Sequence, residues 1–175
     1  EFKNKTNAAG GYYIARYEAS YGTDGKANSK ISTGLIQTIL TKPTTEGQLW
    51  NNISQSEAAT ASQNMYDSEK FTSDLVNSYA WDTAIVFIQT FGGTEYTTYS
   101  RKIGQTINAN LTNTGENEDN PLNINDLASN ACEWTTETSN YLDDNCTYRG
   151  GNYTFSSRYT ANRLGSSTSA SYTDF

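Results

Sequence analysis

The chain has 175 residues, a length that fits one domain with a single core, and we expect residues 1–175 to form one domain, trimmed at one or both ends. The net charge is −7 and the Lys and Arg residues are scattered, so we expect no nucleic-acid partner. No run approaches the roughly 20 apolar residues that cross a bilayer, so this segment is not expected to insert into a membrane. The absence of histidine removes the commonest general base and metal ligand.

The first expected elements are extended. Residues 11–18 alternate aromatic and β-branched residues with smaller or polar ones after a Gly-Gly turn, which predicts a strand. Residues 21–34 are polar and rich in turn formers. Residues 34–40 are apolar and predict a second short strand, which Pro43 ends.

Two helices follow. Ser54 and Glu57 have the spacing of a capping box, which predicts a helix over 55–66 with Ala58, Ala61 and Met65 on its core face. Apolar residues recur at three- and four-residue spacing over 72–90, and Gly92-Gly93 supplies a stop. This pattern predicts the main buried helix, whose apolar positions are Leu75, Val76, Ala80, Trp81, Ala84, Ile85, Phe87 and Ile88.

Residues 93–125 show little periodicity and carry Gly, Asn and acidic residues, which predicts a long exposed loop. Its carboxylates, Glu116, Glu118 and Asp119, are potential calcium ligands through oxygen. The alternative interpretation is a solvated acidic loop, because the twelve-residue spacing of a calcium loop is absent.

The two cysteines, Cys132 and Cys146, have two interpretations. They are either a metal or redox pair or a structural disulfide between adjacent strands. Zinc sites normally need four ligands, and this chain has no histidine to complete one. A disulfide would stabilise the fold by about 3 kcal/mol for a loop of this length and would indicate an oxidising, extracytoplasmic location.

Two segments resemble the sulfatase-modifying-factor domain, which is the formylglycine-generating-enzyme-like branch of the C-type lectin fold. The first is Asp126-Leu-Ala-Ser-Asn-Ala-Cys-Glu-Trp134, and the second is Arg149-Gly-Gly-Asn-Tyr153. They occur in the order that the family shows. The resemblance implies an α+β, C-type-lectin-like fold, in which two main helices pack on short antiparallel strands with much irregular loop.

The resemblance also implies roles for single residues. Some members bind calcium at the first element, which here would use the side chains of Asp126 and Glu133 and the carbonyls of Ser129 and Ala131. The alternative is that both carboxylates accept hydrogen bonds from backbone N–H groups around Trp134. Cys132 and Cys146 would form a disulfide of the frame. The copper-dependent oxidases of the family place reactive cysteines after Arg-Gly-Gly, where this chain has none, so no copper is expected.

A second branch of the family comprises the variable proteins of diversity-generating retroelements, whose variable residues surround Arg-Gly-Gly on a rigid binding face. The tail after residue 152 is rich in Tyr, Asn, Ser and Thr, a composition shared with antibody paratopes. The alternative is a polar, poorly constrained loop. The expected ligand contacts are Tyr153, Phe155, Tyr159, Asn162, Leu164, Ser166, Ser167 and Tyr172. We expect Arg149, Arg158 and Arg163 to brace the loop backbone.

Together these features predict a non-enzymatic receptor or adhesion domain that binds a protein or glycan through its C-terminal loops. The expected location is extracellular, on a cell or virion surface, with oligomers forming through regions outside the chain. Two alternatives stay open at this point. One is a relative of the formylglycine-generating oxidases, and the other is a structural subunit of the pilin or fibre-tip kind.

Overall fold

The computed structural model describes residues 2–33, 42–66, 68, 71–92, 111–116, 119–140, 145–153 and 160–167. These residues form an α+β structure. Its helices are α1 (Phe2–Ala9), α2 (Gln55–Gln63), α3 (Ser78–Phe91) and the 3-10 turn η1 (Pro121–Asn123). Its strands are β1 (Ser20–Tyr21), β2 (Ala27–Asn28), β3 (Glu133–Trp134), β4 (Cys146–Arg149) and β5 (Arg163–Ser166).

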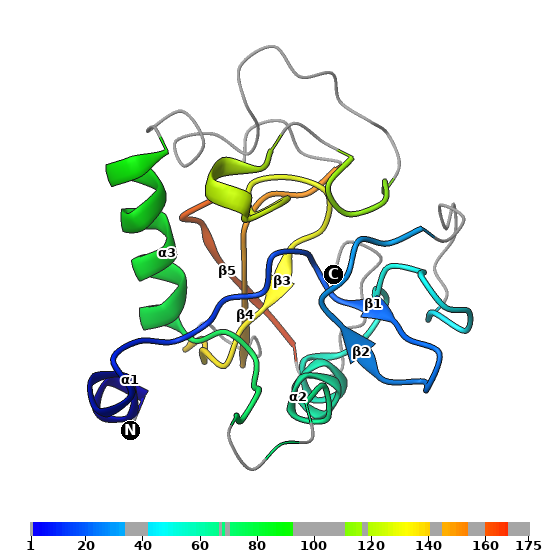
Figure 1. Cartoon of the computed structure of the whole chain (residues 1–175), viewed down its shortest axis with the longest axis horizontal. Coiled ribbons are helices and arrows are strands. Elements are labelled where there is room, and N and C mark those ends of the chain that lie inside the picture. Colours follow the sequence, from blue (N-terminus) through cyan, green and yellow to red (C-terminus); the bar gives the residue numbers. More distant parts are fainter. Residues whose placement is uncertain are drawn as a thin grey trace.

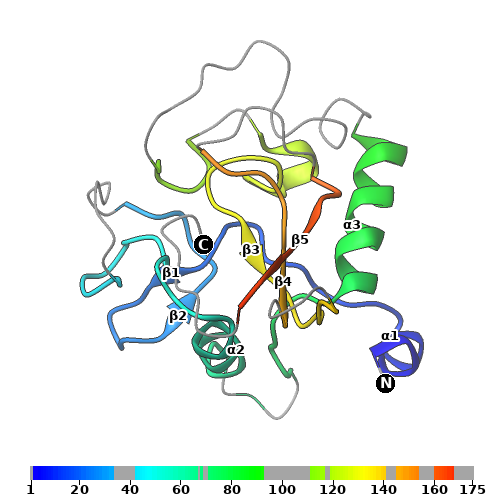
Figure 2. The same ribbon diagram turned by 180° about the vertical axis from the view of Figure 1, so that it is seen from behind.

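The strands form two small antiparallel sheets. β1 and β2 make a hairpin, and β3, β4 and β5 make a three-stranded sheet in chain order. Helix α3 stands on one side of the larger sheet, while α2 and the β1–β2 hairpin lie on the other (Figure 1). Figure 2 shows the same arrangement from behind, with β5 crossing in front of β4. The larger sheet is therefore the centre on which both main helices are placed.

Helix α3 begins later than its apolar pattern predicts. The side chain of Asn77 accepts a hydrogen bond from the N–H of Ala80, so the helix starts at Ser78 and not near residue 72. Leu75 and Val76 precede the helix and pack against the core from an extended segment. The buried face is confirmed for Ala80, Trp81, Ala84, Ile85 and Ile88, whereas Phe87 is 45% exposed.

Helix α2 has the predicted capping box. The Ser54 hydroxyl accepts from the N–H of Glu57, and the Glu57 carboxylate accepts from the N–H of Ser54. The predicted core face is wrong for two of three positions, since Ala58 is buried but Ala61 and Met65 are partly exposed. The helix has only nine residues, and only a narrow part of its surface meets the sheet.

The buried apolar residues form clusters on both sides of the larger sheet. One cluster joins α2 to the sheet and comprises Ile53, Ala58, Cys132, Trp134 and Cys146. A second joins α3 to the η1 region and comprises Trp81, Ile85, Ile88, Ile124 and Leu127. The two indole N–H groups are satisfied inside these clusters, because Trp134 donates to the carbonyl of Ile53 and Trp81 to that of Thr160.

The N-terminal region differs from the sequence prediction. Residues 11–18 form no strand, and a helix that the sequence did not indicate, α1, precedes them. Their extended backbone is fixed by isolated contacts, such as the Arg16 carbonyl accepting from the N–H of Asn125. Alternation favours an extended chain, but a strand also needs a neighbouring strand in register. The strand expected at 34–40 lies outside the described residues.

The segment predicted as a long exposed loop is partly core. Leu111, Thr114, Asp119 and Ile124 are all buried, and residues 121–123 form η1. The described parts of this segment therefore cover the end of α3 and contribute polar groups to the interior. Glu116 is exposed, as predicted, while Glu118 lies outside the described residues.

Candidate functional site

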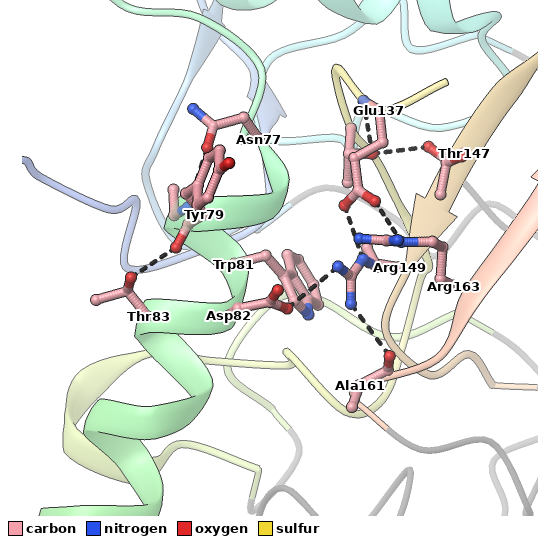
Figure 3. A network of polar contacts seen from close by, with 12 residues as sticks. Asn77, Tyr79, Trp81, Asp82, Thr83, Glu137, Thr147, Arg149, Ala161 and Arg163 are labelled. Carbon is pink, nitrogen blue, oxygen red and sulfur yellow. Dashed lines mark hydrogen bonds and ion pairs between the residues drawn. The ribbon is translucent and has the colours of Figure 1, made fainter. Parts of the chain in front are cut away.

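Arg149 is the centre of a buried polar network at the end of β4. Its side chain is 4% exposed, and its guanidinium lies between α3 and the segment after β3 (Figure 3). Nε donates to Oε1 of Glu137 at 2.8 Å, and Nη2 donates to Oδ1 of Asp82 at 3.1 Å. Nη1 donates to the carbonyl oxygen of Ala161 at 3.1 Å. A planar guanidinium suits three acceptors in different directions, which a lysine ammonium on the same stem does not match.

A second arginine completes the charge balance. Nε of Arg163 lies 2.5 Å from Oε2 of Glu137, so each oxygen of this carboxylate meets one guanidinium (Figure 3). Glu137 is 7% exposed, whereas Arg163 and Asp82 are more than half exposed. The network therefore has two positive and two negative groups, with one of each buried. Arg149 contacts the loop backbone at the Ala161 carbonyl, as the bracing role predicted for it requires, whereas the contact of Arg163 is with a side chain. Arg158 lies outside the described residues.

Backbone hydrogen bonds hold the described residues on both sides of residues 154–159. On the near side, the N–H of Tyr153 donates to the Asn130 carbonyl at 2.8 Å, and Asn152 is 1% exposed. On the far side, the indole N–H of Trp81 donates to the carbonyl of Thr160 at 3.0 Å. The carbonyl of the next residue accepts from Arg149, as described above. The near end is thus bonded to the segment before β3, and the far end to α3 and to Arg149 of β4.

The predicted contact residues do not all share one exposed surface. Among the described ones, Asn162, Leu164 and Ser167 are partly exposed. Tyr153 is partly buried against the cluster of Leu49, Leu111 and Ala131. Ser166 is 3% exposed in β5, so the prediction of a ligand contact is wrong for this residue. Alternation along β5 turns its side chain inward. Phe155, Tyr159 and Tyr172 lie outside the described residues.

Four carboxylates lie in and around the segment 126–134, the first of the two segments that carry the resemblance. The sequence singled out only three of them. Glu18 accepts hydrogen bonds from the N–H of Ala131 at 3.0 Å and from the side-chain amide of Asn130 at 2.6 Å. Asp119 accepts from the N–H of Ala128, and Asp126 from that of Gly115, with the Ser129 hydroxyl between the two aspartates. Glu133 is the fourth.

Burial controls the protonation of this cluster. Burial, together with the nearby charge of Asp126, raises the pKa of Asp119 to about 7 against the opposing effect of the hydrogen bond from Ala128. Burial also raises the pKa values of Glu18 and Glu133 well above their usual range. The charge of Asp126 also raises the pKa of Glu18, and the charges of Glu18 and Asp126 also raise the pKa of Glu133. Protons therefore neutralise part of the cluster near neutral pH.

The two carboxylates predicted to hold calcium have different surroundings in the structure. Asp126 is directed to the Gly115 N–H and the Ser129 hydroxyl, which agrees with the alternative interpretation of this carboxylate. Glu133 Oε2 is buried without a hydrogen-bond partner among the described residues. Calcium takes six to eight oxygen ligands. Across the described ranges, no three His, Cys, Asp or Glu side chains are placed to hold a metal ion. The calcium site that the resemblance implies stays a prediction.

Glu133 also explains the glycine that follows Arg149. A methyl group on Gly150 would lie 2.5 Å from Glu133 Oε2 and 3.0 Å from the Leu127 carbonyl oxygen. Gly150 has a φ of +87°, a conformation that L side chains rarely adopt. In the sheet register, Glu133 is the direct partner of Arg149. The two segments that carry the resemblance, 126–134 and 149–153, are therefore in direct contact through the neighbouring strands β3 and β4.

The structure corrects the predicted disulfide. Both cysteines lie in described residues and are thiols, each 2% exposed. Trp134 pairs with Tyr148 in the antiparallel register, which places Cys132 and Cys146 four positions out of alignment. At about 3.3 Å per residue this offset is roughly 13 Å along the strands, whereas bridged Cα atoms lie within about 7 Å. The Cys146 thiol instead donates to Oε1 of Gln55. Burial raises the pKa of this thiol.

Sequence reasoning missed three residues of these two sites, namely Glu18, Asp82 and Glu137. Each lies at a distance along the chain from its partners, so no local spacing indicates the contact. The sequence did offer one indication, a charged residue within an apolar stretch. Asp82 follows Trp81 in a strongly apolar helix. Glu18 likewise follows an aromatic run.

Comparisons of the chain with protein-family models, curated proteins and solved structures found no match. No helix within the described ranges has the length and apolar character needed to cross a membrane.

Proposed function

We propose that this chain is a non-enzymatic binding domain of the receptor or adhesion type, displayed on a cell or virion surface, with a C-type-lectin-like fold of the formylglycine-generating-enzyme-like branch. Its ligand is a protein or glycan that contacts the segment after Asn152. The direct pairing of Glu133 with Arg149 supports the fold assignment, because these residues belong to the two elements that carry the resemblance.

The observation that carries the proposal is the fixed base of residues 154–159. Asn152 and Thr160 on the two sides are buried, and the flanking backbone is bonded to Asn130, to Trp81 of α3 and to Arg149. Flanking residues that are already bonded in place reduce the conformational entropy that ordering for a ligand costs. A buried ion-pair network beside one end of this segment supports the proposal that the segment is presented to a ligand.

The composition of the segment agrees with this role. Residues 152–175 contain three Tyr and six Ser but neither Cys nor His. Tyrosine offers a large rigid contact area at low entropy cost, and Ser adapts its hydrogen bonds. The missing thiol and imidazole remove the groups on which copper-thiolate and imidazole-based catalysis depend.

The test uses two substitutions, Phe155→Ser and Tyr159→Ser, made together. Labelled protein is incubated with a printed glycan array and with a panel of intact cells, and the bound signal of the variant is compared with that of the wild type. We expect the variant to lose every signal that the wild type gives, because aromatic anchors dominate binding surfaces of this kind.

The matched control is Tyr79→Ser, which removes an aromatic residue that is 67% exposed on α3. It should leave binding unchanged. Equal loss in both variants, or no loss in the double variant, would reject the C-terminal segment as the contact surface. A gene neighbourhood that contains a reverse transcriptase and a near-copy of the codons for residues 140–175 would further support the variable-protein assignment.

A further inference from the structure

A separate hollow lies between α2 and the β1–β2 hairpin. Its volume is about 550 Å³, within the roughly 300–1,000 Å³ typical of small-molecule sites. The lining residues all lie between Gly25 and Asn64. Among the described residues, none of those after Asn152, where the ligand contacts were predicted, lines the hollow.

Trp50 and Ile53 are the large apolar residues that line the hollow. Tyr21 stacks on the Trp50 indole, with ring centroids 5.4 Å apart and planes inclined by 29°. The backbone of Trp50 is fixed as well, because its N–H donates to the Ala19 carbonyl at 2.8 Å. One face of the ring is therefore covered, and the remaining surface is held in place beside the hollow.

Trp50 differs in this respect from the other tryptophans. Trp81 and Trp134 are 2% and 4% exposed and donate their indole N–H groups to backbone carbonyls in the core. Trp50 is partly exposed. An aromatic ring that is both fixed and accessible can stack against an apolar ligand face.

The wall on the α2 side is polar. Ser56, Thr60 and Asn64 follow one another at four-residue spacing, so their side chains lie on one face of the helix, with Ala61 beside them. Two hydroxyls and an amide supply both hydrogen-bond donors and acceptors. The face carries small side chains, which leaves space between it and Trp50.

The charges at the rim nearly cancel. Lys42 forms an ion pair and a hydrogen bond with Glu57 across the opening, and Lys26 comes from the hairpin. The hydrogen bond from Lys42, followed by that from the N–H of Ser54, lowers the pKa of Glu57, so this carboxylate is an ionised acceptor at neutral pH. The lining does not concentrate positive charge as a phosphate site does.

We propose that this hollow binds a saccharide unit. A sugar ring has an apolar C–H face and a rim of hydroxyl groups that donate and accept. The C–H face would stack on Trp50, and the hydroxyls would exchange hydrogen bonds with Ser56, Thr60 and Asn64. This site is distinct from the C-terminal surface, so either proposal stands if the other fails.

The indole N–H signals of ¹⁵N-labelled protein provide the test, because the three tryptophans give one signal each. The protein is titrated with the methyl glycosides of glucose, galactose, mannose and N-acetylglucosamine. The Trp50 signal is assigned with Trp50→Phe or, if that variant does not fold, by backbone assignment. At least one glycoside should shift the Trp50 signal saturably while the Trp81 and Trp134 signals stay in place.

Two pairs of variants on α2 provide the controls. Ala61→Phe fills the hollow and should abolish the shift, whereas Ala59→Phe, at a position that does not line the hollow, should preserve it. Asn64→Ala should weaken binding roughly 2- to 12-fold, the effect of one lost hydrogen bond. Gln63→Ala removes the neighbouring amide, which does not line the hollow, and should have no effect on affinity.

Three results would overturn the proposal. The first is a Trp50 signal that no glycoside moves at up to about 50 mM, far above the roughly millimolar Kd of a weak ligand. The second is an equal shift with glycerol, which lacks a ring face to stack. The third is an unchanged shift in a folded Ala61→Phe variant.

Discussion

Replacing Arg149 by methionine should destabilise the protein by about 3 kcal/mol. Breaking a buried ion pair by removing one partner costs about 3–5 kcal/mol, because the other charge remains buried. Arg149 is 4% exposed and Glu137 7% exposed, so the pair meets this condition. The lower end applies because Arg163 still holds the second oxygen of Glu137. Loss of the contact with Asp82 should add little to this destabilisation, because the Asp82 side chain is 59% exposed.

Urea unfolding followed by tryptophan fluorescence measures this loss. With a slope of about 2 kcal/mol per molar urea, the midpoint should fall by about 1.5 M. Arg163→Met is the matched control, because Arg163 contacts the same carboxylate from a side chain that is 56% exposed. It should cost no more than about 1 kcal/mol. Equal effects of the two substitutions, or an unchanged midpoint for Arg149→Met, would refute the reasoning.

Four further predictions address the acidic cluster, the cysteines and the turn after β4. Because the folded pKa of Asp119 is raised to about 7 from its ordinary 3.8, its contribution to stability is present below pH 4 and is lost as the pH rises through 7. At 1.36 kcal/mol per pKa unit, the free energy of unfolding should fall by at most about 4 kcal/mol over this pH range. Urea unfolding of Asp119→Asn should not show this fall. The same pH dependence in the wild type and the variant would contradict the assignment. Iodoacetamide should label Cys132 and Cys146 only after unfolding, without reductant, and mass spectrometry showing no label in unfolded protein would restore the disulfide. EDTA should leave the melting temperature unchanged, whereas a rise with added calcium would restore the calcium site that the resemblance implies. Gly150→Ala should lower the melting temperature because of its positive φ and the approach of the glutamate carboxylate, and a wild-type value would show that the turn adapts.

The sequence by itself determined the local features of this protein. The capping box at Ser54 and Glu57 formed as predicted, because all of its partners lie within four residues. The apolar face of α3 was readable for the same reason, since helical spacing is a local property. The start of that helix could not be read from the apolar pattern, because Asn77 caps the helix and leaves the apolar residues before it outside.

Only the tertiary structure decided which distant groups meet. The alternating pattern that predicts a strand at 11–18 forms none, because no described strand lies in register beside it. The cysteines look suitable for a bridge in sequence, yet the pairing of Trp134 with Tyr148 separates them along the sheet. Glu18, Asp119 and Glu133 became neighbours although about 100 residues separate the first from the others. Burial and register depend on the whole packed chain, so spacing alone does not reveal them.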